Sequence, residues 1–252
     1  MRISILTTDT LHHTFFVKKI KEKYNDVSVI CENKREIEYS DLFSKSFLIE
    51  KKRFEKLQEK YEAKKWFNGK KLKLNNFCEP IFVENINTKQ SIKLLKNLNP
   101  TLIIVFGTGK LNREFIKNFK SKIYNLHGGD PQKYRGLDSH LWSIYHKDFN
   151  SLKTTLHKIT PQLDTGDIYK IDFIKLWPNM KLFQLRLSNT ETCLKLALDL
   201  FKSVENKKPI ECFKQKNIGR YYSLMPESLK LKVKNNFEIF IEKNLKDAKN
   251  KI

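Results

Sequence analysis

No stretch of this 252-residue sequence approaches the roughly 20 apolar residues that a membrane-spanning helix requires. The N-terminal residues MRISILTTDTLHHTFF lack the charged start, the apolar run and the cleavage site of a secretory signal. The four cysteines, at positions 31, 78, 193 and 212, form no CxxC pair of the kind found in zinc or redox sites, and their scatter suggests reduced thiols. These absences predict a cytoplasmic protein with no membrane association and no bound metal.

The sequence also lacks internal repeats and any linker rich in proline, glycine and serine. Hydrophobic residues make up 40% of the chain, and 18 phenylalanines and 9 tyrosines can fill a core. A chain of this length can form one α/β domain with a small addition. We expect a main catalytic domain over residues 1–205 and a C-terminal extension of loops and a helix over residues 206–252.

Acidic residues are too few to balance the basic ones: 28 Asp and Glu stand against 49 Lys and Arg, a net charge of +21. One interpretation is a polyanionic partner, either nucleic acid or a phosphorylated or nucleotide-linked substrate. The other is the lysine-rich composition of proteins from AT-rich genomes, because the lysines are spread along the whole chain. We favour the second for most of the charge and expect no nucleic-acid partner, although such a surface attracts an anionic substrate.

Strand-like and helical segments alternate along most of the chain. Short β-rich or apolar runs predict strands, and apolar residues recurring near every third or fourth position predict helices. The initial order of strand, helix and strand is the beginning of a parallel sheet, so the expected fold class is α/β. The predicted strands are 2–8, 26–33, 71–86, 101–106, 121–129, 154–159 and 167–174, and the predicted helices are 13–24, 54–67, 88–100, 113–119, 137–148, 181–206 and 237–252.

The stretch YNLHGGDPQKYRGLDSHLW, residues 124–142, is the densest in groups that can do chemistry. Asn125 and His127 alternate on a predicted strand, so both side chains point to one side at the carboxyl end, where open α/β sheets bind ligands. Gly128 and Gly129 then turn the chain and let a ligand approach the backbone. An amide beside an imidazole can stabilise a carbonyl oxygen that becomes negative and can move a proton. The alternative is that both side chains only satisfy backbone groups of the turn.

Two further loops carry possible site residues. FGTGKL, residues 106–111, has neither the third glycine of a dinucleotide motif nor the Ser or Thr of a phosphate-binding loop. It is interpreted as a tight turn whose exposed backbone amides and carbonyls can bind a flat heterocycle. In LDTGD, residues 163–167, either Asp164 or Asp167 could orient the imidazole, although an Asp-capped turn is the commoner use of such a pattern.

The remaining histidines and aromatic residues give weaker signals. His12 and His13 follow the first strand and reach the same sheet edge, but solvated imidazoles near a helix cap are the simpler interpretation. His140, His146 and His157 show no metal-ligand spacing, and the three tryptophans are assigned to the core. In GRYY, residues 219–222, a cation and two phenols can hold a phosphate and a nucleobase or can form a packed turn.

IYNLHGGDPQKYRG followed by LDTGDI resembles the formyltransferases that depend on 10-formyltetrahydrofolate, most closely the sugar N-formyltransferases. The resemblance extends over residues 1–200 or so and is strongest from 101 to 170. It implies a Rossmann-like, mostly parallel sheet with helices on both faces, and it implies Asn125, His127 and Asp164 as catalytic residues. The strand and loop LIIVFGTGKL look like the family's pterin-binding segment, which implies a folate site. The residues expected to line that site are Phe106, Gly107, Thr108, Leu111, Asp164 and Asp167.

The sequence departs from the family where many members have a Pro/Ser-Leu-Leu-Pro run after the histidine and this chain has Gly-Gly-Asp-Pro. Substrate identity therefore depends on other features. Members that formylate methionyl-tRNA usually carry a β-barrel domain of about a hundred residues after the catalytic domain, whereas the residues after the last long helix here number about fifty. The length and the basic surface suit sugar N-formyltransferases, which modify nucleotide-linked amino sugars.

We therefore expect an N-formyltransferase with a nucleotide-linked amino sugar as substrate, a place in lipopolysaccharide O-antigen biosynthesis, and a homodimer, as is common among such relatives. Alternatives are an enzyme acting on methionyl-tRNA or glycinamide ribonucleotide, a 10-formyltetrahydrofolate hydrolase, and a nucleic-acid-binding protein with a vestigial site. Strand ends, charge and stacking suggest the substrate-binding residues: Thr8, Asp9, His12, Gly128, Gly129, Arg135, Arg220 and Tyr222.

Overall fold

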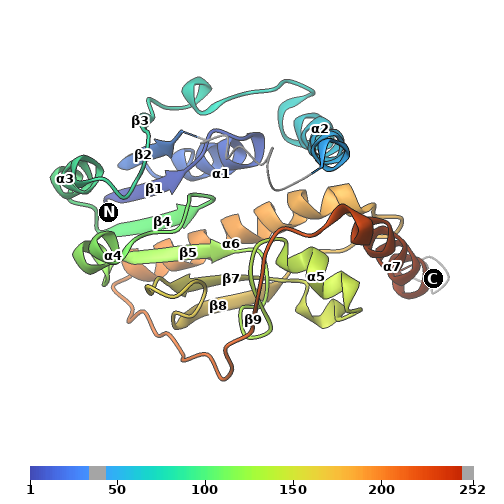
Figure 1. Cartoon of the computed structure of the whole chain (residues 1–252). Helices are drawn as coiled ribbons and strands as arrows, with labels where there is room; N and C mark the ends of the chain where they lie inside the picture. Colours follow the sequence, from blue (N-terminus) through green and yellow to red (C-terminus); the bar gives the residue numbers. More distant parts are fainter. Residues whose placement is uncertain (34–43, 246–252) are drawn as a thin grey trace.

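A seven-stranded sheet forms the centre of the computed structural model, which describes residues 1–33 and 44–245 (Figure 1). Its strands lie in the order β3-β2-β1-β4-β5-β7-β8. The first five pair in parallel, and β7 is antiparallel to both of its neighbours, β5 and β8. The fold is therefore α/β with a mostly parallel sheet, as predicted. The strands are β1 (Ile3–Thr7), β2 (Val27–Glu32), β3 (Ile81–Val83), β4 (Leu102–Phe106), β5 (Ile123–His127), β7 (Lys153–Lys158) and β8 (Ile168–Phe173).

Helices cover both faces of this sheet because its central strands are apolar on both sides. Helices α1 and α6 pack on one face, and α3 and α4 on the other (Figure 1). The helices are α1 (Leu11–Lys21), α2 (Lys45–Phe67), α3 (Lys89–Leu98), α4 (Arg113–Phe119), α5 (Ser139–Tyr145), α6 (Leu185–Glu205) and α7 (Glu227–Leu245), with short 3-10 turns at Leu74–Asn76, Phe149–Ser151 and Leu182–Gln184. Within the described residues, no helix is both long enough and apolar enough to span a membrane.

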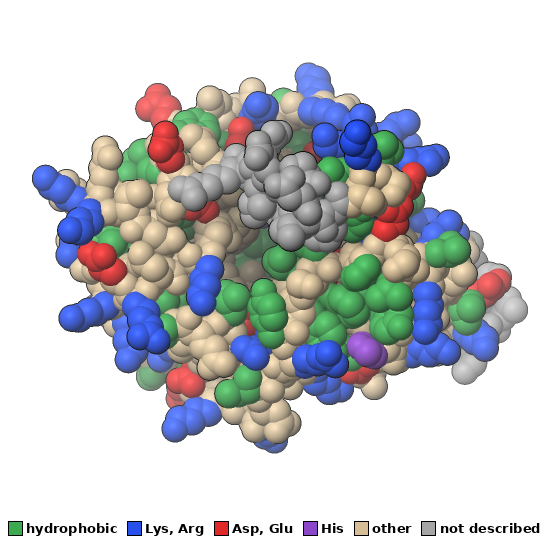
Figure 2. All heavy atoms as spheres, in the orientation of Figure 1, with side chains coloured by type: hydrophobic (Ala, Val, Ile, Leu, Met, Phe, Trp, Pro, Cys, Tyr) green, Lys and Arg blue, Asp and Glu red, His purple; other side chains and the backbone are tan. Residues whose placement is uncertain are grey.

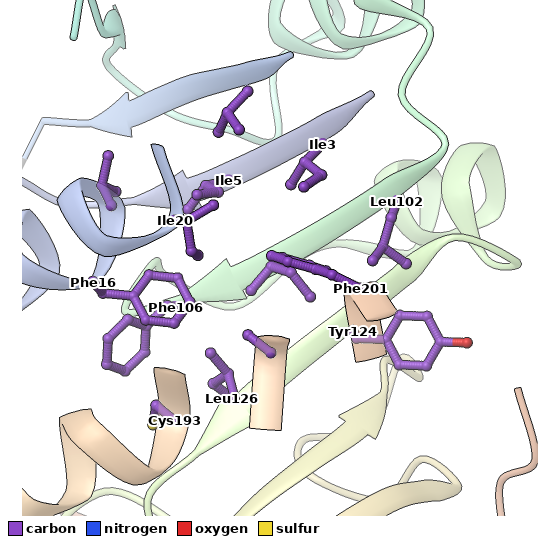
Figure 3. Close-up of a cluster of buried hydrophobic side chains, with 14 of the residues drawn as sticks. Ile3, Ile5, Phe16, Ile20, Leu102, Phe106, Tyr124, Leu126, Cys193 and Phe201 are labelled. Carbon is purple, nitrogen blue, oxygen red and sulfur yellow. The ribbon is translucent and has the colours of Figure 1, made fainter. Parts of the chain in front are cut away.

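The larger core lies between the sheet and the pair α1 and α6. Figure 3 shows side chains from β1, β4 and β5 pointing toward those of the two helices. Phe16 of α1 and Phe201 of α6 are fully buried there. Alternate residues of the strands face this layer, such as Leu126 of β5, and their neighbours face away. The side chains of Asn125 and His127, on either side of Leu126, therefore point to the opposite face of the sheet.

An ion pair joins α2 to α6 beneath the surface. Both nitrogens Nε and Nη2 of Arg186 donate to the carboxylate of Glu62, at 2.7 and 2.8 Å. Glu62 is fully buried, and burial raises the pKa of its carboxyl although Arg186 opposes the rise. Helix α2 is also longer than the sequence predicted: it begins at Lys45 rather than near residue 54. The cap explains the earlier start, because the Ser44 side chain accepts from the amide of Phe47.

The C-terminal part of the chain packs against the main body. Its strand β9 (Arg220–Tyr222) pairs in parallel with β6 (Tyr134–Gly136), and α7 packs on α5. Val233, Phe237 and Ile241 of α7 are buried in a third core. Neither β6 nor β9 was predicted as a strand, because three-residue segments carry too little periodicity. Helix α7 begins at residue 227, ten residues before the prediction, and residues 246–252 of the predicted helix lie outside the described residues.

Candidate active site

The site lies where the sheet changes from parallel to antiparallel pairing. Asn125 and His127 lie at the carboxyl end of β5, as predicted. The neighbouring strand β7 runs antiparallel and places His157 directly opposite Asn125. The loop between β7 and β8 then carries Asp164 to the same place. Four polar side chains from three segments therefore meet at this edge.

Asn125 and His157 are joined by a hydrogen bond. The Nδ2 atom of Asn125 lies 3.2 Å from Nε2 of His157, and Nδ1 of His157 lies 2.8 Å from the carbonyl oxygen of Lys158. Because that carbonyl can only accept, Nδ1 carries the hydrogen and Nε2 accepts from the amide. The Asn125 side chain is thereby oriented with its nitrogen toward the site. The second N–H of the same nitrogen can donate to a ligand.

One ring nitrogen of His127 is bound to a backbone carbonyl, which leaves the other nitrogen facing Asp164. Its Nε2 donates to the carbonyl oxygen of Tyr134 at 3.1 Å, so the neutral ring carries its free lone pair on Nδ1. Nδ1 lies 3.7 Å from Oδ2 of Asp164. Burial lowers the pKa of His127, and the charge of Asp164 offsets part of that effect. A buried, neutral imidazole of this kind can accept a proton on the nitrogen that faces the carboxylate.

Asp164 connects both histidines. Its Oδ2 accepts from the backbone amide of Gly136 at 2.9 Å, and its Oδ1 lies 3.6 Å from Nε2 of His157. Burial of this carboxyl opposes ionisation, but His127, His157 and the Gly136 amide together outweigh it and hold the pKa of Asp164 below its usual range. Asp164 also has a φ of 54°, in the left-handed region that few residues other than glycine adopt. The site therefore combines a buried carboxylate, two imidazoles and an amide.

The end of β4 and the loop after it contain four of the six residues predicted for the folate site, Phe106, Gly107, Thr108 and Leu111. Gly107 has a φ of 86°, and a Cβ atom there would lie 2.1 Å from the ring of His13, so this position requires glycine. The loop is fixed by Glu32, whose two carboxylate oxygens accept from the amides of Gly109 and Ile86, at 2.9 and 3.0 Å. Glu32 was not predicted as part of this site, because nothing in the sequence shows that the end of β2 lies beside this loop.

The predicted substrate-binding residues after β1 are Thr8, Asp9 and His12. They lie near that loop, and each makes a contact within the fold. Thr8 contacts His13 through its hydroxyl group, at 2.9 Å from Nδ1. Asp9 accepts from the backbone amide of Leu74 at 3.0 Å. The ring of His12 packs edge-on against Phe106, the last residue of β4. This group therefore shares the carboxyl edge of the sheet with the 106–111 loop.

The two glycines after His127 make room for neighbouring side chains. A Cβ at Gly129 would lie 2.8 Å from Nε2 of His127, and one at Gly128 would lie 3.1 Å from the amide of Asn189. The Gly129 position therefore lets the imidazole fit.

Asp167 lies at the end of the loop between β7 and β8. Its backbone carbonyl accepts from the amide of Lys158 at 2.9 Å and so closes that loop.

The three residues predicted to hold a nucleotide are divided between two sides of the β6–β9 pair. Arg135 donates to the carbonyl oxygens of Gly219 and Leu163, at 2.6 and 3.0 Å, and so lies toward the loop that carries Asp164. The Tyr222 ring stacks between those of Trp142 and Tyr134, with centroids 4.8 and 5.6 Å away. The guanidinium of Arg220 lies 5.4 Å from the centroid of Tyr222.

A shallow cavity of about 570 Å³, wide open to solvent, lies beside these aromatic rings. Hydrophobic side chains gather over α5 on this face, with lysine and arginine side chains around them (Figure 2). One cation at the cavity, Lys133, is paired with Asp148 at 2.9 Å, which leaves Arg220 to supply most of the positive charge. The cavity is lined by Gln132, Lys133, Tyr134, His146, Asn217, Ile218, Gly219, Arg220 and Tyr222. Across residues 1–33 and 44–245, no three His, Cys, Asp or Glu side chains are grouped so as to hold a metal ion.

Known proteins resemble this chain in sequence and in fold. The methionyl-tRNA formyltransferase of Finegoldia magna is 36% identical over 94 residues, 37% of this chain and 30% of the relative. That of Clostridium tetani is 30% identical over 187 residues, 70% of this chain and 60% of the relative. The chain therefore spans less than two thirds of the length of these curated relatives.

A solved structure shares the fold: the formyltransferase PseJ from Anoxybacillus kamchatkensis, in complex with UDP-4,6-dideoxy-4-formamido-L-AltNAc and tetrahydrofolate. The TM-score is 0.54 at 19% identity, covering 92% of this chain and 90% of that one. Residues 19–188 match the family described as formyl transferase. Because that match extends over more than half of the sequence, the chain belongs to the formyl transferase family.

Proposed function

We propose that this protein transfers a formyl group from 10-formyltetrahydrofolate to the amine of a nucleotide-linked amino sugar. The observation that carries the proposal is the group of Asn125, His127, His157 and Asp164, in which each side chain lies within 3.7 Å of another. The group combines a donor for a developing negative charge with bases that can take a proton. Membership of the formyl transferase family agrees with this chemistry.

The proposed reaction gives a role to Asn125, His127 and Asp164, while His157 orients Asn125. The acceptor amine attacks the formyl carbon, the new C–N bond forms, and the carbonyl oxygen becomes negative. Asn125, and His127 once protonated on Nδ1, donate to that oxygen, and one such donor contributes about 2.7–4 kcal/mol to catalysis. Asp164 or His127 takes the proton from the attacking nitrogen. The bond from carbon to the folate nitrogen then breaks, the side chain that took the proton returns it to that nitrogen, and tetrahydrofolate leaves.

The donor is expected to bind at the loop over residues 106–111. The loop follows the buried strand β4, next to β5, so it adjoins the catalytic group along the sheet edge. Its backbone is fixed by Glu32 and by the close contact of Gly107 with His13. Fixed amides and carbonyls can recognise the hydrogen-bonding edge of a pterin without first losing conformational freedom.

The cavity beside Tyr222 supports a nucleotide-linked acceptor. Its volume is within the range of small-molecule sites, and stacked aromatic rings can hold a base while Arg220 attracts a phosphate. Tyr134 connects the two regions, because its ring lines the cavity and its carbonyl oxygen accepts from His127. The solved PseJ complex contains a UDP-linked sugar, which favours the same substrate class.

A second candidate acceptor is methionyl-tRNA, because both sequence relatives described above are methionyl-tRNA formyltransferases. The net charge of +21 is also compatible with a polyanion. The test is to incubate the protein and 10-formyltetrahydrofolate with UDP-, dTDP- and GDP-linked amino sugars or with methionyl-tRNA. Free folate is followed by absorbance and products by mass spectrometry. Formylated nucleotide sugar supports the proposal, whereas formylated tRNA, or formate release without a formylated acceptor, refutes it.

A further inference from the structure

The loop that carries Asp164 has a tightly constrained backbone. Asp164 lies in the left-handed region, with a φ of 54°. At Gly166 the chain approaches β7 so closely that a Cβ atom would lie 1.7 Å from the carbonyl oxygen of Lys158. A non-glycine residue in such a backbone conformation persists when its surroundings hold it there. The threonines of the loop bond to one another and to Gln162, and contacts from outside act together with these bonds to determine where the carboxylate lies.

Gln215, in the C-terminal part of the chain, makes two such contacts. Its Nε2 donates to the backbone carbonyl oxygen of Asp164 at 2.8 Å and to that of Gly166 at 2.9 Å. Both hydrogens of the side-chain amide are thus used on two carbonyls that flank one residue. A carbonyl can only accept, so the nitrogen must face the loop. The oxygen Oε1 is buried and, within the described part of the chain, makes no hydrogen bond.

The segment that carries Gln215 is itself fixed on both sides. Phe213 exchanges two backbone hydrogen bonds with Ile168 of β8, at 2.8 and 2.9 Å. The amide of Lys216 donates to the side chain of Gln132 at 2.9 Å. Gln215 lies between these two anchors, so its amide is presented to the loop from a defined position.

Arg135 adds a second connection between the same segments. Its Nε donates to the carbonyl oxygen of Gly219 and its Nη1 to that of Leu163, the residue before Asp164. The carbonyls of Leu163, Asp164 and Gly166 are therefore all bound by side chains that belong to, or are tied to, residues 213–222.

We propose that Gln215 is a positioning residue that holds the Asp164 loop in the conformation that brings the carboxylate to His127 and His157. The functional meaning of this role rests on the catalytic assignment of Asp164 in the proposed function. The C-terminal part of the chain thereby belongs to the catalytic apparatus, although it contributes no group to the reaction itself.

The test replaces Gln215 with Met, which keeps the size of the side chain and removes both donors. Lys214→Ala, at an exposed neighbouring position, is the matched control. We expect Gln215→Met to lower kcat by about 10- to 100-fold with little change in KM for either substrate, because a displacement of about 1 Å costs this much. Near-UV circular dichroism monitors the fold, and Gln215→Ala is the second variant if Met does not fit.

A second measurement does not depend on which substrate the enzyme uses. The titratable groups that face His127 are Asp164, His157, Asp130 and His140. Since the charge of Asp164 raises the pKa of His127, a displaced carboxylate should lower it, which NMR titration of labelled histidine can measure. Unchanged kcat and unchanged titration overturn the proposal, and so does a fall in kcat without a shift in titration. Absence of formyl transfer in the wild type refutes the proposed function but leaves the titration result valid.

Discussion

At the scale of single residues, the site depends on one carboxylate that both histidines share. The sequence predicts Asn125 and His127 together, because residues two apart on a strand point to one side. It leaves Asp164 and Asp167 as alternatives, and the loop conformation brings the carboxylate of Asp164 to the histidines. His157 is not predicted. It lies 32 residues after Asn125 in the sequence, and its place opposite Asn125 depends on the register between the antiparallel strands β5 and β7.

Replacing Asp164 with Asn should lower kcat by about 100- to 1,000-fold, because the amide keeps the shape but loses the charge that supports a protonated His127. Steady-state kinetics with saturating formyl donor measures the effect. Asp172→Asn is the control, because that carboxylate, on β8, forms an ion pair at the surface with Lys195 of α6. Comparable activity in Asp164→Asn and in the control would exclude the catalytic assignment.

His140 should make stability depend on pH. Burial lowers its pKa from 6.5 to about 4, and its Nε2 donates to the carbonyl of Lys153 at 2.6 Å. The unfolded chain binds a proton near pH 6.5 and the folded chain does not, so the stability from the neutral ring is full above that pH and is lost as the pH falls toward 4. Between pH 7 and pH 5 the loss is on the order of 2 kcal/mol.

Urea denaturation of His140→Gln at both pH values checks this expectation. The variant keeps an N–H donor and should lose less stability between pH 7 and pH 5 than the wild type does. His146→Gln, at an exposed histidine, should retain the wild-type dependence. An equal pH dependence in His140→Gln and the wild type would show that the buried ring does not cause it.

At the scale of elements, the predicted strands and helices of the main sheet are present because their apolar periodicity extends over several residues. Segment 71–86 is the exception: strand-like alternation is present in the sequence, but only Ile81–Val83 forms a strand, where it pairs with β2. Strands β6 and β9 were missed because each gains its hydrogen bonds from a partner far away in sequence. The ion pair between Glu62 of α2 and Arg186 of α6 could not be predicted either, since these residues are 124 positions apart.

Breaking the ion pair between Glu62 and Arg186 should destabilise the protein where α2 packs on α6. Glu62→Ala leaves the guanidinium of Arg186 without its carboxylate, and we expect a loss of about 3 kcal/mol in the free energy of unfolding. Lys71→Ala removes an exposed ion pair with Glu59 and should cost less than about 1 kcal/mol. Replacing both Glu62 and Arg186 with Met should recover most of the loss. Equal losses in Glu62→Ala and Lys71→Ala, measured by urea denaturation, would contradict this view.

At the scale of the whole molecule, the α/β class and the helix-covered sheet follow from the sequence, whereas the position of the C-terminal part does not. Residues 206–252 were expected to form an extension, and the described part contributes buried side chains to a common core with α5. Its contacts depend on complementary surfaces rather than on any local pattern, which is why their prediction from sequence fails.

Phe237→Ala tests whether this part unfolds together with the rest. Phe237 is fully buried, and its truncation should cost about 3–5 kcal/mol. If α7 and the main body form one cooperative unit, tryptophan fluorescence and far-UV circular dichroism should show the same single transition, shifted to lower urea. Leu231→Ala, at a site that is 67% exposed, should leave the transition nearly unchanged. Two separate transitions would indicate an independent C-terminal unit.

The register of β5 against β7 limits how this chain can change in length. Asn125 faces His157, and the next pair, Leu126 with Leu156, faces the core beneath α6. Deleting or inserting one residue within β7 would exchange these two positions, turning an imidazole into the apolar interior and a leucine toward the candidate active site. Viable insertions and deletions in homologues should therefore avoid these two strands and accumulate in the connections around them.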